Sequence, residues 1–312
     1  MSGKTLQMSS FGINGRLGNQ LFQYYFMHLL KDGLGCDIVL PSRAYTASLL
    51  FATTPEHNIQ PAATAFQFDD SEEARYAGPT VDILKLKALL ADPVIDAVDV
   101  KGYFQYHTSY FSNVRSRTLL HTLLSPHAEL STQQEIGFTA LLKQNVTVLE
   151  QFLGGRQLLA LHHRRGDYIE LNQRHHGNGV FYMPDFQVVL KQVKDVISAS
   201  GMRNTLFYIC SDDLDYCRTE LEQANLSCIC SETFFGKAAN NHLSHLLLDV
   251  AVMVHADCLV AANSSLSIFA ALLNQRSKLF LRPDPFGYGL VSFHPWNTHV
   301  LCKRNLSHAD RV

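Results

Sequence analysis

The second half of the chain repeats one pattern three times: a short apolar run, a polar cluster, and a stretch of helical length. The apolar runs lie at residues 158–162, 205–210 and 257–262, and the polar clusters at 162–168, 211–213 and 263–265. The predicted helices are 183–199, 214–223, 241–256 and 266–274, and a further strand at 278–281 is stopped by Pro283. Short apolar runs bounded by turn residues are typical of buried strands, and strands that alternate with helices form parallel sheets. Ligands bind at the carboxyl edge of such sheets. The pattern therefore predicts an α/β fold with a site built from the three clusters.

The first half begins with the same alternation. Its predicted elements are a strand, a glycine-rich loop, a helix and a second strand, at residues 5–11, 12–18, 19–31 and 36–40. The loop precedes a helix whose free N–H groups attract anions, although it lacks the G-x-G-x-x-G spacing of dinucleotide-binding folds. We therefore expect two Rossmann-like lobes, 1–152 and 153–312, that face a central cleft.

Two adjacent arginines, Arg164 and Arg165, follow the first of the three apolar runs. An arginine offers a fixed fork of N–H donors that matches a phosphate group, and it stays charged. Gly166 beside them has no side chain, so the backbone there can adopt conformations that other residues disfavour. The simpler interpretation is a pair of surface arginines bound to Asp167, and these residues alone support both interpretations equally.

The other two clusters stand where helices are expected to begin. Ser211 or Asp212 is placed to cap one helix, and Asn263 or Ser264 is placed to cap the other. Capping is a sufficient reason for each cluster by itself. Three polar clusters and an arginine pair along one sheet edge, however, indicate a nucleotide site.

In such a site the arginines and the helix N-terminus at Ser264 and Ser265 would hold a diphosphate. Asp212 or Asp213 would accept hydrogen bonds from a ribose or a base. The segment Asp213-Leu214-Asp215 also has the spelling of a metal-binding Asp-X-Asp motif. Because arginines and helix ends can neutralise a diphosphate, we expect no metal.

The composition is that of a globular protein. A net charge of -2 over 312 residues gives no reason to expect nucleic-acid binding. We expect no integral membrane segment, since the longest apolar stretch, 243–254, is broken by Ser244, His245 and Asp249. The sequence predicts a cytoplasmic protein, peripheral to a membrane if its substrate is lipid-linked. Four Asn-X-Ser/Thr sequons, including the one at Asn263, are then chance occurrences.

The cysteines and histidines do not form a recognisable metal motif. The seven cysteines lack paired C-x-x-C spacing and are expected to be free thiols. His242 and His245 are one helical turn apart, but no third ligand is evident near them.

Five segments together resemble a known family, the galactoside α-1,2-fucosyltransferases. They occur in the family's order between about residues 11 and 285, at 15–24 (GRLGNQLFQY), 102–105 (GYFQ), 162–168 (HHRRGDY), 211–213 (SDD) and 262–267 (ANSSLS). One such motif is weak evidence, whereas five in order identify the chain as a divergent member.

The resemblance implies a two-lobed GT-B fold and an enzyme of carbohydrate metabolism that transfers L-fucose from GDP-fucose to a glycan. The acceptor would be O2 of a terminal galactose, with inversion, no metal and no further cofactor. Residues 1–152 would form the acceptor side and 153–312 the donor side. Arg164 would contact the β-phosphate, Arg165 would support the loop, and His162 and Asp212 would lie near the guanosine.

The sites that the resemblance and the residue chemistry imply fall into three groups. The donor-binding residues are Gly15, Arg16, Gly18, Asn19, Gln20, His162, Arg164, Arg165, Ser211, Asp212, Asp213, Asn263, Ser264 and Ser265. The catalytic candidates are Arg164, with Asp167 and Glu170 as candidate general bases. The alternative role of Asp167 is to orient Arg165 or to cap a turn. The acceptor-side candidates are Tyr103, Gln105 and Tyr168. Acceptor contacts are also expected in variable loops such as 45–95 and 170–181.

The chain departs from the family pattern after Ser267. Where the family has a tryptophan-rich segment, residues 268–274 have IFAALLN, and the single tryptophan is Trp296. The lost indoles keep two other hypotheses open: a transferase that uses another nucleotide sugar, and a non-catalytic glycan- or nucleotide-binding protein on a decayed transferase fold.

Overall fold

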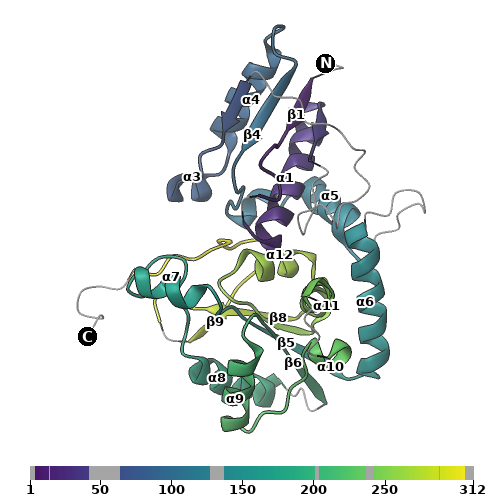
Figure 1. Cartoon of the computed structure of the whole chain (residues 1–312), viewed down its shortest axis with the longest axis vertical. Helices are drawn as coiled ribbons and strands as arrows, with labels where there is room; N and C mark the ends of the chain where they lie inside the picture. The colour runs from purple at the N-terminus through teal and green to yellow at the C-terminus, as the bar shows by residue number, and fades with distance from the viewer. Residues whose placement is uncertain are drawn as a thin grey trace. The chain divides into compact units, whose positions relative to one another are not determined.

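The computed structural model describes residues 4–13, 15–41, 64–126, 137–200, 204–236, 242–287 and 289–305. The chain forms two compact units (Figure 1). The first comprises residues 1–141 and 296–299, and the second comprises 142–295 and 300–312. The boundary thus falls inside a helix, α6 (Gly137–Leu153), and the first unit recovers a short segment from near the end of the chain.

The first unit is built on a parallel four-stranded sheet of order β2-β1-β4-β3. Its strands are β1 (Thr5–Gln7), β2 (Asp37–Val39), β3 (Thr64–Gln67) and β4 (Ala97–Lys101). The helices are α1 (Leu17–Leu34), α3 (Glu72–Ala77), α4 (Thr80–Ala91), the 3-10 helix η1 (Thr108–Phe111) and α5 (Val114–Leu124).

Aromatic side chains make the core of this unit. The ring of Phe26 on α1 stacks on Phe104 at 4.5 Å, and Phe68 meets both rings edge-on. Phe104, Tyr106 and Phe111 are fully buried. The aromatic cluster after β4 is therefore mostly core.

The second unit has a five-stranded sheet of order β6-β5-β7-β8-β9, in which only β9 is antiparallel. Its strands are β5 (Gln157–His163), β6 (Thr205–Ser211), β7 (Cys258–Val260), β8 (Leu279–Pro283) and β9 (Leu290–Ser292). The helices after α6 are α7 (Tyr168–Arg174), α8 (Phe186–Ser200), α9 (Leu214–Gln223), α10 (Glu232–Phe235), α11 (His242–His255) and α12 (Ser265–Leu273).

Helices cover both faces of this sheet (Figure 1). On one face, Leu190 and Val193 of α8 and Leu221 of α9 pack with Leu159 and Leu161 of β5. On the other face lie α11 and α12, which contact each other. Because β5 is covered on both sides, its residues 158–163 are all buried, as a continuous apolar run predicts.

Several predicted boundaries were wrong for identifiable reasons. The helix expected from residue 183 begins at Phe186, because the Asp185 carboxylate accepts the N–H groups of Gln187 and Val188. The strand expected to stop before Pro283 includes it, since Pro283 pairs with Leu290 of the edge strand β9. Part of the loop region from 45 to 95, which we expect to contact the acceptor, lies outside the described residues.

Candidate functional site

The order of strands in the second unit marks one position for a ligand. From β5 the chain continues to β6 on one side, while β7 pairs with the other side of β5. The order of the strands therefore reverses between β5 and β7, which makes this position a topological switch point. Open α/β sheets bind ligands beyond the carboxyl ends of the strands at a switch point. The arginine cluster follows β5, and Asn263, Ser264 and Ser265 follow β7.

Asp212 organises the loop after β5. Its Oδ1 accepts the backbone N–H groups of Arg165 at 2.8 Å and Gly166 at 3.1 Å, and its Oδ2 lies 2.5 Å from Arg164 Nη1. A Cβ at Gly166 would lie 2.5 Å from that carboxylate, so only glycine permits this approach. Burial acts to raise the pKa of Asp212, but these hydrogen bonds and the Arg164 charge outweigh it and hold the pKa below its ordinary value. Asp212 thus carries a negative charge that fixes the loop.

The two arginines have different surroundings. Arg164 lines a pocket, and its Nη2 also lies 2.5 Å from Asp167 Oδ1. Arg165 pairs with Asp213, and its guanidinium lies 3.8 Å above the ring of Tyr216. Arg164 is therefore placed to meet a ligand, while Arg165 ties the loop to α9.

Two contacts differ from the sequence predictions. Asp167 was expected to orient Arg165 or cap a turn, but it contacts Arg164, and its side chain makes no cap on α7. Asp213, rather than Ser211 or Asp212, caps α9 by accepting the N–H of Tyr216. Asp212 cannot serve as the cap, because the arginine loop already occupies its oxygens.

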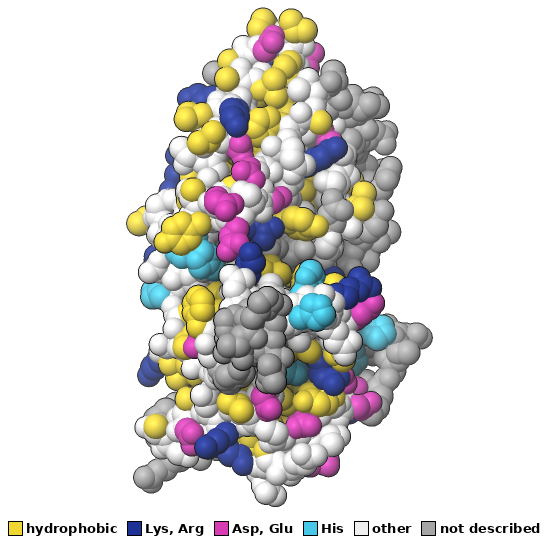
Figure 2. Space-filling view, turned by 90° about the vertical axis from the view of Figure 1, so that its left-hand side faces the viewer, with side chains coloured by type: hydrophobic (Ala, Val, Ile, Leu, Met, Phe, Trp, Pro, Cys, Tyr) yellow, Lys and Arg dark blue, Asp and Glu magenta, His cyan; other side chains and the backbone are white. Residues whose placement is uncertain are grey.

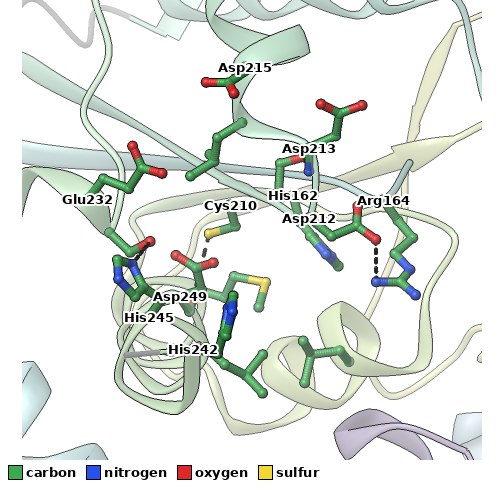
Figure 3. A pocket seen from close by; sticks show the side chains of 16 residues that line it. His162, Arg164, Cys210, Asp212, Asp213, Asp215, Glu232, His242, His245 and Asp249 are labelled. Carbon is green, nitrogen blue, oxygen red and sulfur yellow. Dashed lines mark hydrogen bonds and ion pairs between the residues drawn. The ribbon is translucent and has the colours of Figure 1, made fainter. Parts of the chain in front are cut away.

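The pocket beside Arg164 has a volume of about 490 Å³. Arg164, Asp212 and His162 lie toward one end, and Asp249, His245 and Glu232 toward the other (Figure 3). Burial and, next, the Arg164 charge lower the pKa of His162 to about 3. The imidazole at this end is therefore neutral, so the positive charge comes from Arg164.

Asp249 lies at the far end of the pocket, on α11. Its Oδ1 accepts the hydroxyl of Tyr208 at 2.8 Å, and among the described residues no donor contacts Oδ2. Burial raises its pKa to about 8, an effect that the Tyr208 hydrogen bond only partly offsets. The site therefore contains a carboxyl group with one oxygen left for a ligand.

Asp249 was not among the predicted site residues. Its signal in the sequence is a carboxylate that interrupts the apolar stretch 243–254, because an ionisable group on the buried face of a helix is rare without a structural or functional reason. This interruption served only as an argument against a membrane span.

The cluster after β7 meets the pocket at the start of α12. Ser264 is the N-cap residue of α12 but makes no side-chain cap, and Leu266 in the first turn lines the pocket. Asn263 caps nothing: its amide donates to the carbonyls of Val180 and Cys302, and its Oδ1 accepts from Arg282. Asn263 is therefore a buried structural residue, and the start of α12 faces the pocket.

Tyr168 and Glu170 of α7 occupy different environments. The Tyr168 hydroxyl donates to the carbonyl of Asn263 at 3.0 Å, and its ring lies 5.5 Å from the Arg164 guanidinium. Glu170 is exposed and pairs with Arg174 one helical turn later. Tyr168 thus joins the two clusters, whereas Glu170 does not line the described pocket.

In the first unit, the structure joins the two motifs expected there. Gln105 Nε2 donates to Asn19 Oδ1 at 2.7 Å, and Gln20 Nε2 donates to the Gly15 carbonyl at 3.0 Å. Gly15 has φ +86°, and a Cβ there would overlap the Asn19 side chain. Of the remaining candidates, Gly18 is buried in α1, Arg16 is its exposed N-cap residue, and Tyr103 is exposed.

Two further properties concern metals and membranes. Among the residues that the structure describes, no three His, Cys, Asp or Glu side chains are grouped so as to hold a metal ion. No helix in that part of the chain combines the length and apolar character of a membrane span.

Two α/β units with parallel sheets, the second with an arginine-bearing pocket at its switch point, define a glycosyltransferase of the GT-B type. The chain belongs to glycosyl transferase family 11, whose sequence profile matches residues 2–284.

Solved structures show the same fold. One is NodZ alpha-1,6-fucosyltransferase soaked with GDP-fucose, at 12% identity and a TM-score of 0.51, covering 94% of this chain and 99% of that one. Another is the fucosyltransferase NodZ from Bradyrhizobium, at 10% identity and a TM-score of 0.51, covering 95% of this chain and 100% of that one. Comparison with curated protein sequences gives no match. At these identities the likeness establishes the fold, and the family match establishes a glycosyltransferase.

Proposed function

We propose that this protein transfers L-fucose from GDP-fucose to a hydroxyl of a glycan, O2 of a terminal galactose, with inversion and without a metal. Residues 1–152 would form the acceptor side and 153–312 the donor side. The family and the GDP-fucose bound to NodZ support the donor. The observation that carries the proposal is Arg164, held by Asp212 and Asp167 at the mouth of the pocket.

In the proposed reaction, the acceptor oxygen bonds to the anomeric carbon of fucose as the bond from that carbon to the β-phosphate oxygen breaks. The electron pair leaves with GDP, and the hydroxyl proton passes to a base or to solvent. Negative charge on the diphosphate is greatest after the bond has broken. Arg164 and the N–H groups at the start of α12 would therefore stabilise the transition state more than the bound donor.

The pocket suggests how GDP would lie. The diphosphate belongs at the Arg164 end and the base at the Asp249 end. Guanine presents N1–H and N2–H donors, which suit a carboxylate oxygen without a partner. The other carboxylates are engaged: Asp212 by the arginine loop, Asp213 by Arg165, and Asp215 and Glu232 by Arg218. We therefore assign guanine recognition to Asp249 and give Asp212 a positioning role.

The base candidates are unequal. Glu170 is paired with Arg174 on an exposed helix face, whereas Asp167 contacts Arg164 itself. Of the two, Asp167 is the one that would lie near the reacting bond. In the first unit, the acceptor-side candidate Gln105 donates to the donor-side candidate Asn19, and Tyr103 is accessible, as an acceptor contact would require.

The residues that replace the family's indoles bear on the decayed-transferase alternative. Residues 267–273 of α12 are all buried. The substitutions therefore produce a packed apolar helix rather than a damaged one, which favours an active enzyme. A cytoplasmic location stays a prediction from the sequence.

The test is GDP release from a panel of nucleotide sugars with lactose as acceptor, with and without EDTA. The proposal expects turnover with GDP-fucose alone, unaffected by EDTA, and an α-linked fucose at O2 of galactose by NMR. Preferred turnover of another nucleotide sugar would support the second transferase hypothesis. Binding of GDP-fucose without turnover over a glycan panel would support the binding-protein hypothesis, and loss of activity in EDTA would refute metal independence.

A further inference from the structure

The first unit carries an exposed aromatic residue in a fixed position. Tyr76, near the end of α3, is 69% exposed. Its ring stacks on His299 at 5.3 Å and 30°, and His107 meets His299 edge-on at 4.8 Å. Figure 2 looks onto the side of the molecule where α3 lies, and hydrophobic, histidine and acidic side chains lie next to one another there.

The three rings come from segments that are held together. His107 donates its backbone N–H to the carbonyl of Arg75, which precedes Tyr76. Thr108 and Thr298 exchange hydrogen bonds, with Thr108 N to the Thr298 carbonyl and Thr298 N to Thr108 Oγ1, both at 2.9 Å. The three rings are therefore held in place before a ligand binds, so that little free energy is lost in ordering them on binding.

His107 adds a directed polar group. Its Nδ1 accepts the backbone N–H of Ser109, so the neutral ring carries its proton on Nε2. Burial, and then the charge of His299, lower the pKa of His107, which keeps it neutral near pH 7. The ring thus carries an N–H donor, and its centroid lies 5.8 Å from that of Tyr76.

The neighbouring charges exclude an anionic ligand. Ser71 caps α3, and its first turn carries Glu72 and Glu73. Asp69, just before the helix, has a pKa lowered chiefly by hydrogen bonds from Ser71 and remains ionised. The occupant is therefore not an anion. It needs an apolar face for the ring and polar groups, such as hydroxyls, for the polar rim. A pyranose has both, since one of its faces consists of C–H groups.

We propose that Tyr76, His107 and His299 form a subsite for a pyranose residue of the acceptor glycan, an inference that rests on the proposed function. Tyr76 and His107 belong to residues 1–152, which are assigned to the acceptor side, and His299 lies in the segment 296–299 that joins the same unit. None of the family motifs contains these three residues. Its task is to hold a neutral sugar beyond the one that receives fucose.

The experiment compares Tyr76→Ala, Tyr76→Phe and Leu84→Ala, the last being a matched truncation of another exposed apolar residue, on α4. Tyr76→Ala should raise the KM for a galactose-terminated oligosaccharide about tenfold, the expected value of one aromatic contact. Tyr76→Phe and Leu84→Ala should behave as wild type, and the KM for GDP-fucose should be unchanged in all three. An acceptor KM for Tyr76→Ala within about twofold of wild type would overturn the subsite.

Saturation-transfer NMR with the oligosaccharide, without donor, keeps the two proposals distinguishable. If wild type binds the sugar and Tyr76→Ala does not, the subsite stands even where no nucleotide sugar is turned over. If wild type transfers fucose but shows no difference from Tyr76→Ala in binding or KM, the subsite fails and the transferase stands.

Discussion

The two units fix the segments of their family motifs with different chemistry. In the second, the loop after β5 is held by charge: Asp212 accepts two backbone N–H groups and pairs with Arg164. In the first, neutral amides do this work: Gln105 donates to Asn19, and Gln20 to the carbonyl of Gly15. Charged groups thus stand where a diphosphate is proposed and neutral ones where a sugar is proposed. Pairing by charge holds the Arg164 guanidinium in a fixed orientation at the pocket, which the recognition of a leaving diphosphate requires.

The largest effect is expected for Arg164→Ala. Loss of a contact made mainly in the transition state should cost about 3 kcal/mol of barrier, roughly 100-fold in kcat. The matched control, Arg165→Ala, should lose much less, because Arg165 contacts Asp213 and Tyr216. Steady-state kinetics measure both, and equal losses would contradict the different roles assigned to the two arginines.

The next effect concerns Asp249 and pH. Guanine donates hydrogen bonds, so it binds the ionised carboxylate, and below a pKa of about 8 binding must first remove a proton. Between pH 6 and 8, GDP affinity should therefore rise with pH by up to about tenfold per unit, and level off above 8.

Isothermal titration calorimetry of GDP binding at several pH values measures this dependence. In Asp249→Asn, GDP should bind more weakly, and its affinity should lack the rise with pH that Asp249 causes. Both proteins bind the same GDP, so titration of the nucleotide itself cancels in the comparison. Parallel pH profiles for the two proteins would remove Asp249 from base recognition.

A smaller effect is expected in the first unit. Gln105→Leu removes the amide donor to Asn19 Oδ1 at a partly buried site and should lower the free energy of unfolding by about 1–2 kcal/mol. GDP affinity should stay within about twofold, because the charged pocket is untouched. Urea unfolding measures the loss of stability, and titration with GDP measures the affinity. A large loss of GDP affinity would mean that this amide pair contributes to donor binding.

The smallest effect is expected for Glu170→Gln. Its pair with Arg174 is exposed, and such pairs contribute about 0–1 kcal/mol. Turnover should remain within about twofold of wild type at every pH. A large loss of kcat that follows a single ionisation would return Glu170 to the role of general base.

The sequence was most informative where local chemistry decides the structure. The helix 214–223 was predicted to the residue, since a polar cap precedes it and an apolar stripe defines it. The α/β class and the GT-B type were also predicted correctly. Asp249 was missed because its partner Tyr208 lies on β6, 41 residues away, and the contact depends on how α11 packs on the sheet. Which carboxylate holds which arginine likewise depends on the tertiary fold.

The hydrogen bonds between Thr108 and Thr298 also have a consequence for synthesis of the protein. The partners are separated by 190 residues. At 5–20 residues per second, the ribosome needs roughly 10 to 40 s to make the chain between them. The first unit therefore cannot complete its packing when its own strands have emerged, and waits until the chain has been made as far as Thr298. A chain cut after residue 141 would lack this closing segment, so the two units are not separable at the point where the contacts divide them.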